Sequence, residues 1–155
     1  MQDFVHLHVH TQYSLLDGQA SVARLVDKAM KNGMKGIAVT DHGNMFGIKE
    51  FTNYVNKKNS GPKGEVKDLK KRIAGIEAGT IECEDKEAEI AACKAKIVEA
   101  ENKLFKPIIG CEMYVARRTM DLKEGKPDQS GYHLIVLAKN ETGYHNLIKL
   151  VSHAW

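Results

Sequence analysis

The sequence has 155 residues, 43% of them hydrophobic, and a formal net charge of +3. It is long enough to bury a core and has no apolar run of the roughly 18 residues that span a bilayer, so we expect a globular protein without a membrane partner. The excess charge is too small to predict that the chain binds duplex DNA by itself. The N-terminus shows no export signal and the three cysteines include no CxxC pair, so we expect free thiols and a cytoplasmic location.

The N-terminal third has the pattern of a strand, a helix and a second strand. From Phe4 to Thr11, apolar side chains alternate with histidines, which is the period of a strand. Helical spacing of apolar residues follows from Ser21, a good N-cap, to Gly33, a good stop. A short apolar strand over residues 37–40 then leads into Asp41. Two strands joined by a helix predict a parallel pair.

The later elements predict an α/β fold. A second helix is expected to bury Ile48, Phe51, Tyr54 and Val55. Strands are expected over residues 107–115 and 132–138, followed by a helix from 141 to 155 that buries Leu147, Ile148 and Val151. Four strands without a closing element indicate an incomplete β/α barrel, namely its first four βα units. Because such a fragment exposes unpaired strand edges, we expect it to self-associate.

Residues 60–105 have a different character from the flanking sequence. Lys63 to Lys106 contains equal numbers of basic and acidic residues, and its apolar residues recur in steps of three and four. One straight helix would carry the chain about 60 Å away at roughly 1.5 Å per residue. We therefore expect an inserted helical hairpin that turns within Gly79 to Asp85. Its simplest interpretation is a solvated insertion without chemistry.

Six side chains with metal-binding potential accompany the predicted strands. His8 and His10 stand two residues apart, so their rings point the same way from a strand. Asp17 lies in the loop after this first predicted strand. His42, Glu112 and His133 each lie in or next to one of the three later predicted strands. The six candidates are His8, His10, Asp17, His42, Glu112 and His133. Such a set favours zinc, manganese or iron, with magnesium as a further option, and is too large for one tetrahedral ion. Two or three ions would suit phosphoester hydrolysis.

The motifs around these residues resemble the polymerase and histidinol phosphatase (PHP) superfamily. They run from Phe4 to Thr11, Tyr13 to Gly18, Thr40 to Asn44, Gly110 to Tyr114 and His133 to Asn140. Within the superfamily they are more similar to the domain of bacterial replicative DNA polymerases than to histidinol phosphatases. The resemblance implies a seven-stranded β/α barrel, up to three metal ions and ligand roles for the six residues. The family's later motifs, a Cys or His and a terminal Asp-x-His, have no counterpart in this sequence.

Three further residues are expected to support the ligands without binding metal. His6 shares the predicted face of His8 and His10, at a position where the superfamily usually has Asp. Asp41 and Asn44 flank His42, where they could orient that ring, contact substrate or simply form a turn. The sequence assigns no catalytic residue.

The resemblance implies a longer polymerase whose DNA synthesis site lies outside these residues, with DNA and other replisome subunits as partners. The local activity would be phosphodiester hydrolysis, such as proofreading exonuclease activity, although the fragment alone is expected to be inactive. One alternative is a non-catalytic module that stabilises the polymerase and docks a proofreading partner. Another is a free-standing phosphatase of the histidinol phosphatase kind.

Overall fold

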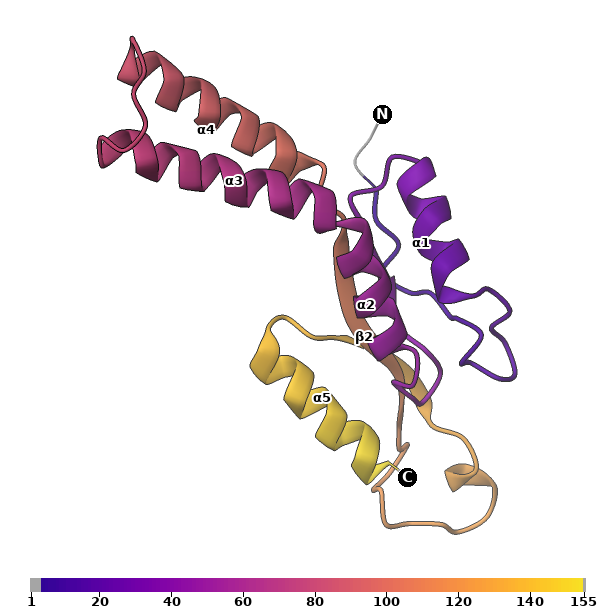
Figure 1. The fold of residues 1–155 in the computed structure, drawn as a ribbon. Helices are drawn as coiled ribbons and strands as arrows, with labels where there is room; N and C mark the ends of the chain where they lie inside the picture. Colours follow the sequence, from indigo (N-terminus) through magenta and orange to yellow (C-terminus); the bar gives the residue numbers. More distant parts are fainter. Residues whose placement is uncertain (1–3, 155) are drawn as a thin grey trace. The chain divides into compact units, whose positions relative to one another are not determined.

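The computed structural model describes residues 4–154, which form five α-helices and a three-stranded sheet (Figure 1). The chain divides into two compact units. One contains the residues up to Tyr54 together with those from Lys106 onward, and the other contains Val55–Phe105. Among the described residues, none of the helices is long and apolar enough to cross a membrane.

The first unit contains the sheet and the helices that flank it in sequence. In chain order its elements are α1 (Val22–Lys31), β1 (Gly36–Val39), the start of α2 (Ile48–Lys58), β2 (Lys106–Val115), a short 3-10 helix η1 (Lys126–Asp128), β3 (Tyr132–Leu137) and α5 (Glu141–His153). Two helices begin at side-chain caps. Ser21 accepts a hydrogen bond from the Arg24 N–H, and Asn140 accepts one from the Gly143 N–H at 2.9 Å. These caps satisfy donors that the first helical turn leaves free.

The sheet is mixed, with strand order β1-β2-β3. β1 pairs with β2 in parallel, whereas β2 pairs with β3 in antiparallel register. The expected series of four βα units is therefore wrong for β3. A parallel return requires a crossover, usually a helix, but the described segment between β2 and β3 contains only η1.

The segment from Phe4 to Thr11 is not a regular strand and bends at Leu7, contrary to the sequence prediction. The Ala38 and Thr40 N–H groups donate to the carbonyl oxygens of His6 and Val9, each at 2.9 Å. The donors are two residues apart and the acceptors three, so the ladder slips by one residue, as in a bulge. As a result, Leu7, expected in the core, has half of its surface exposed.

The core of this unit lies against β1 and α1. Ile37, Ala38 and Val39 of β1 are buried, as are Val22 and Val26 of α1. Continuous burial along β1 is typical of a strand in a parallel pair that is covered on both faces. On α5, Leu147 is buried as predicted, but Ile148 remains 38% exposed.

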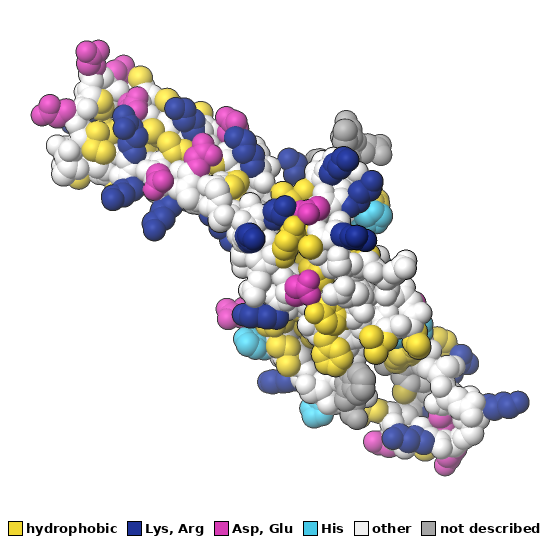
Figure 2. Space-filling view, turned by 45° about the vertical axis from the view of Figure 1, so that its right-hand side comes forward, with side chains coloured by type: hydrophobic (Ala, Val, Ile, Leu, Met, Phe, Trp, Pro, Cys, Tyr) yellow, Lys and Arg dark blue, Asp and Glu magenta, His cyan; other side chains and the backbone are white. Residues whose placement is uncertain are grey.

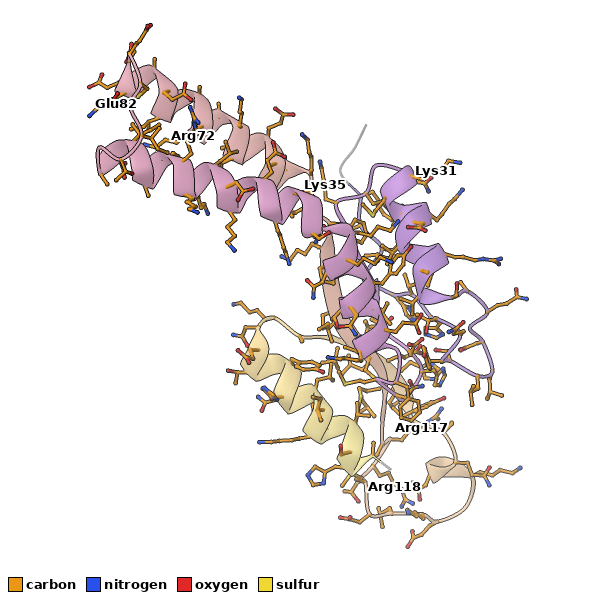
Figure 3. The ribbon with its side chains drawn as sticks, in the orientation of Figure 1. Lys31, Lys35, Arg72, Glu82, Arg117 and Arg118 are labelled. Carbon is orange, nitrogen blue, oxygen red and sulfur yellow. The ribbon has the colours of Figure 1, made fainter. Side chains whose placement is uncertain are left out.

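The second unit is a helical hairpin of α3 (Ser60–Glu77) and α4 (Lys86–Asn102), joined by a turn containing Gly79 at φ 73°. Apolar residues of both helices are buried in it, namely Ile76, Cys93, Ile97 and Ala100. Charges of both signs are interspersed over its surface (Figure 2). Arg72 of α3, which is labelled in Figure 3, donates a hydrogen bond to Glu89 of α4 at 3.0 Å. The hairpin thus has a small apolar seam of its own and ion pairs between its helices.

Candidate metal centre

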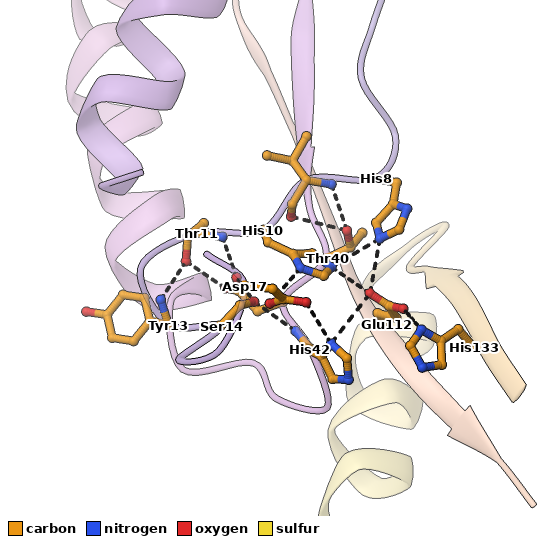
Figure 4. Close-up of polar contacts among 12 residues, drawn as sticks. His8, His10, Thr11, Tyr13, Ser14, Asp17, Thr40, His42, Glu112 and His133 are labelled. Atoms are coloured by element: carbon orange, nitrogen blue, oxygen red, sulfur yellow. Dashed lines mark hydrogen bonds and ion pairs between the residues drawn. The ribbon is translucent and has the colours of Figure 1, made fainter. Parts of the chain in front are cut away.

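Glu112 is the central residue of the histidine cluster (Figure 4). Its side chain is only 4% exposed, and its Oε2 atom lies 3.1 Å from His8 Nε2 and 2.6 Å from His10 Nε2. Its Oε1 atom contacts His133 Nδ1. The two His8 and His10 nitrogens are themselves 3.1 Å apart. One carboxylate on β2 therefore joins imidazoles from the N-terminal segment and from β3.

Asp17 links the remaining histidine to the same cluster. Its Oδ1 atom lies 3.0 Å from His10 Nδ1 and its Oδ2 atom 3.1 Å from His42 Nδ1. His42 follows β1 and forms an isolated parallel bridge with Glu112. The structure thus brings all six predicted ligand residues together. Two groups of three have ligand atoms within 4.8 Å of one another: His8, His10 and Glu112, and His10, Asp17 and His42.

The turn that presents Asp17 depends on Gly18. The Asp17 and Gly18 N–H groups both donate to the Ser14 carbonyl, at 3.1 and 2.7 Å. A Cβ atom at Gly18 would lie 1.8 Å from the Thr11 carbonyl oxygen, which is a steric overlap with backbone. Only glycine therefore allows the chain to close this tightly next to the cluster.

Asp41 lies beneath the cluster and anchors the loop that follows His10. It is 1% exposed. Its Oδ1 atom accepts hydrogen bonds from the Thr11 N–H at 2.6 Å and the Ser14 hydroxyl at 2.8 Å, and its Oδ2 atom accepts one from the Thr11 hydroxyl at 2.8 Å. The Ser14 hydroxyl oxygen in turn accepts from the His42 N–H at 3.0 Å. One buried carboxylate thus fixes the loop and, through Ser14, the backbone of His42.

Asn44 and His6, the other expected supporting residues, have different surroundings. The Asn44 amide donates to the carbonyl oxygens of Tyr13 and His42, both at 3.1 Å. It therefore ties the turn after His42 to the loop before Asp17. The His6 ring packs edge-on against Phe4, with centroids 4.7 Å apart, rather than among the ligands.

The histidines lower the pKa values of both carboxyl groups in the cluster. Burial acts to raise the pKa of Glu112, but hydrogen bonds from His8 and His10 outweigh it, and the net pKa is lowered. Desolvation likewise acts to raise the pKa of Asp17, and hydrogen bonds from His42 and His10 lower it overall. Both groups are therefore held as carboxylates, the form that binds metal.

The donor set fits a divalent cation. In a tetrahedral zinc site with bonds of 2.0–2.1 Å, neighbouring nitrogens lie about 3.4 Å apart. The triangle of His8 Nε2, His10 Nε2 and Glu112 Oε2 has edges of 3.1, 3.1 and 2.6 Å, so it needs only a small expansion to hold such an ion. Because a neutral imidazole has one free lone pair, His10 can serve only one of the two groups at a time.

Sequence reasoning missed three residues that organise this centre. Tyr114 contacts His42 and packs against His133, and its position two residues after Glu112, on the same strand face, was an available signal. Thr11 and Ser14 hold the site loop through Asp41. Their hydroxyls carried no signal, because threonine and serine are common in any loop.

The sequence of this chain matches a known domain family. The PHP domain family matches residues 6–155, so the chain belongs to that family.

Relatives with the same sequence pattern are much longer proteins. The chain is 40% identical over 153 residues to the DNA polymerase III subunit alpha of Treponema pallidum, covering 98% of the chain and 9% of the relative. It is 41% identical over 152 residues to the protein of that name from Borreliella burgdorferi, covering 96% of the chain and 9% of the relative. For that of Aquifex aeolicus the identity is 32% over 160 residues, covering 99% of the chain and 10% of the relative. The chain thus spans about a tenth of the length of these relatives.

Proposed function

We propose that the six-residue cluster binds two or three divalent metal ions and that its activity is phosphodiester hydrolysis. The observation that carries the proposal is the arrangement of four histidines around one buried carboxylate, Glu112, with Asp17 joining two of those histidines. Imidazole and carboxylate donors in this ratio favour zinc, manganese or iron over magnesium. Bound ions would supply a hydroxide nucleophile and neutralise the phosphate.

The residues of the chain have distinct tasks in this scheme. His8, His10 and Glu112 would hold one ion, while Asp17 and His42 would contribute to a neighbouring one. His133, which contacts the other oxygen of Glu112, would add a further imidazole ligand on that side. The His8 and His133 side chains are each 52% exposed, so the cluster is open to solvent on their side. A phosphodiester can approach the ligands from this opening without displacing the core.

We further propose that the chain is the PHP region of a longer replicative DNA polymerase. The names of its relatives and the small share of each that it spans support this view. The longer protein would extend primed DNA in the cytoplasm, with other replisome subunits as partners, and the PHP region would contribute proofreading exonuclease activity. The hairpin of α3 and α4 would be an insertion that takes no part in the site.

The decisive experiment removes two ligands without touching the core. We expect the double variant His8→Ala/His10→Ala to lose the Zn²⁺ or Mn²⁺ that the wild type retains after dialysis, as measured by elemental analysis. Circular dichroism should not change. The matched control is His145→Ala/His153→Ala, which removes two exposed histidines from α5. It should retain metal.

Equal metal content in the wild type and the His8/His10 variant would refute the metal site. Metal binding without hydrolysis of a single-stranded oligonucleotide by the longer polymerase would instead indicate a structural module.

A further inference from the structure

Tyr114 is an aromatic residue inside the histidine cluster, and its role there is distinct from that of a ligand. It follows Glu112 by two residues on β2, so both side chains lie on one face of the strand. Its ring centroid lies 4.8 Å from that of His42 and 4.8 Å from that of His133, its partner across the antiparallel ladder. Its hydroxyl contacts the Nε2 atom of His42. The phenol therefore reaches the cluster, although the residue is half exposed.

The two ring nitrogens of His42 contact different residues. Nδ1 faces the Asp17 carboxylate at 3.1 Å, and Nε2 faces the Tyr114 hydroxyl. A carboxylate can only accept a hydrogen bond, whereas a phenol hydroxyl can donate or accept one. The Tyr114 hydroxyl can therefore pair with Nε2 whether or not that nitrogen carries a proton, and it would accept from an Nε2–H if Nδ1 held a cation. Tyr114 can thus pair with His42 in both states.

We propose that Tyr114 is a positioning residue whose hydroxyl holds the His42 ring with Nδ1 directed at Asp17 and the metal position. The inference rests on the proposed metal centre and extends it to a residue that binds no ion. A half-turn of the imidazole about its Cβ–Cγ bond would replace each nitrogen by a carbon. Torsions of this kind have broad energy wells, so the ring needs a partner to select one orientation. Hydrogen-bond partners of metal-binding histidines serve this purpose, and their loss typically lowers metal affinity about 10–100-fold.

The test removes only the hydroxyl. Tyr114→Phe keeps the ring that packs on His133, and we expect its Zn²⁺ affinity, measured by titration calorimetry on the whole chain, to fall at least about 10-fold. Tyr132→Phe is the matched control. Tyr132 lies on the neighbouring strand at similar exposure, and its ring faces the Arg117 guanidinium at 5.1 Å. This variant should bind Zn²⁺ as the wild type does.

Nitrogen NMR of the imidazole rings provides a readout that a change in stability alone would not alter. In the metal-free wild type we expect the His42 ring nitrogens to show a single set of signals, and in Tyr114→Phe signals from more than one ring orientation. Equal Zn²⁺ affinity in the two proteins, with unchanged His42 signals, would overturn the role of Tyr114 while leaving the metal centre intact. A wild type that binds no Zn²⁺ would instead refute the centre and, with it, this role.

Discussion

The buried carboxylate of Asp41 offers a stringent test of how the site loop is held. It accepts three hydrogen bonds, two from Thr11 and one from Ser14, in a position that is 1% exposed. In Asp41→Ala these three donors lose their acceptor. Because water has little access to this position, the donors stay unsatisfied unless the loop opens. We therefore expect the variant to lose both stability and metal binding.

The magnitude follows from the number and type of bonds. A hydrogen bond to a charged group contributes about 1.5–3 kcal/mol, and the three bonds share one acceptor, so their energies do not simply add. We expect Asp41→Ala to lower the free energy of unfolding by about 3–5 kcal/mol. Asp41→Asn keeps the size and one acceptor oxygen, so it should cost about 1–2 kcal/mol.

Urea unfolding followed by circular dichroism measures these differences. Asp121→Ala, at an exposed loop position, is the control and should change the free energy of unfolding by less than about 0.5 kcal/mol. Ser14→Ala should cost less in the Asp41→Asn background than in the wild type, because the Ser14 hydroxyl donates to the carboxylate. If Asp41→Ala unfolds with the same midpoint as the control, the carboxylate does not hold the loop and the argument fails.

Three other properties can be checked independently. Gly18→Ala should destabilise the fold through backbone overlap, whereas Gly64→Ala, where a Cβ meets nothing within 4 Å, should stabilise α3 by about 0.5–1 kcal/mol; urea midpoints compare them. Burial raises the pKa of the Cys111 thiol to about 11, so iodoacetamide at pH 8 should label the less buried Cys83 first, as peptide mass spectrometry would show. Replacing residues 64–103 with a short Gly-Ser linker should leave one cooperative unfolding transition; its loss would show that the hairpin is integral.

The helices could be predicted from the sequence because their signals are local. Apolar spacing and the Ser21 cap predicted α1. The same spacing predicted the buried side of α2 at Ile48, Phe51 and Val55, but Tyr54, which was also expected there, is only partly buried. The predicted parallel direction of β3 was wrong, although the sequence contained a local indication that β3 runs antiparallel to β2. No helical period occurs between Val115 and Tyr132, and without a crossover helix the strand returns antiparallel.

The six candidate residues could be singled out as a set, but the residues that support them could not. Residue type and position near strand ends pointed to all six candidates, which the structure brings together. The three bonds to Asp41 depend on how two distant segments meet, which no periodicity encodes. His6 shows that sequence spacing alone does not place a side chain in the cluster. It has the right spacing for the cluster, but the slip in the N-terminal segment leaves its ring against Phe4.

Two hydrogen bonds with Thr40 explain how this irregular segment can still bring His8 and His10 to one carboxylate. The Thr40 N–H donates to the Val9 carbonyl at 2.9 Å, and the Val9 N–H donates to the Thr40 hydroxyl oxygen at 2.9 Å. Both backbone groups of the residue between His8 and His10 are therefore held by Thr40, at the end of β1. With the backbone held on both sides of Val9, the His8 and His10 rings both reach the Glu112 carboxylate without a continuous ladder. Thr40→Val, which keeps the shape and removes the hydroxyl, should thus separate the His8 and His10 rings while leaving β1 in place.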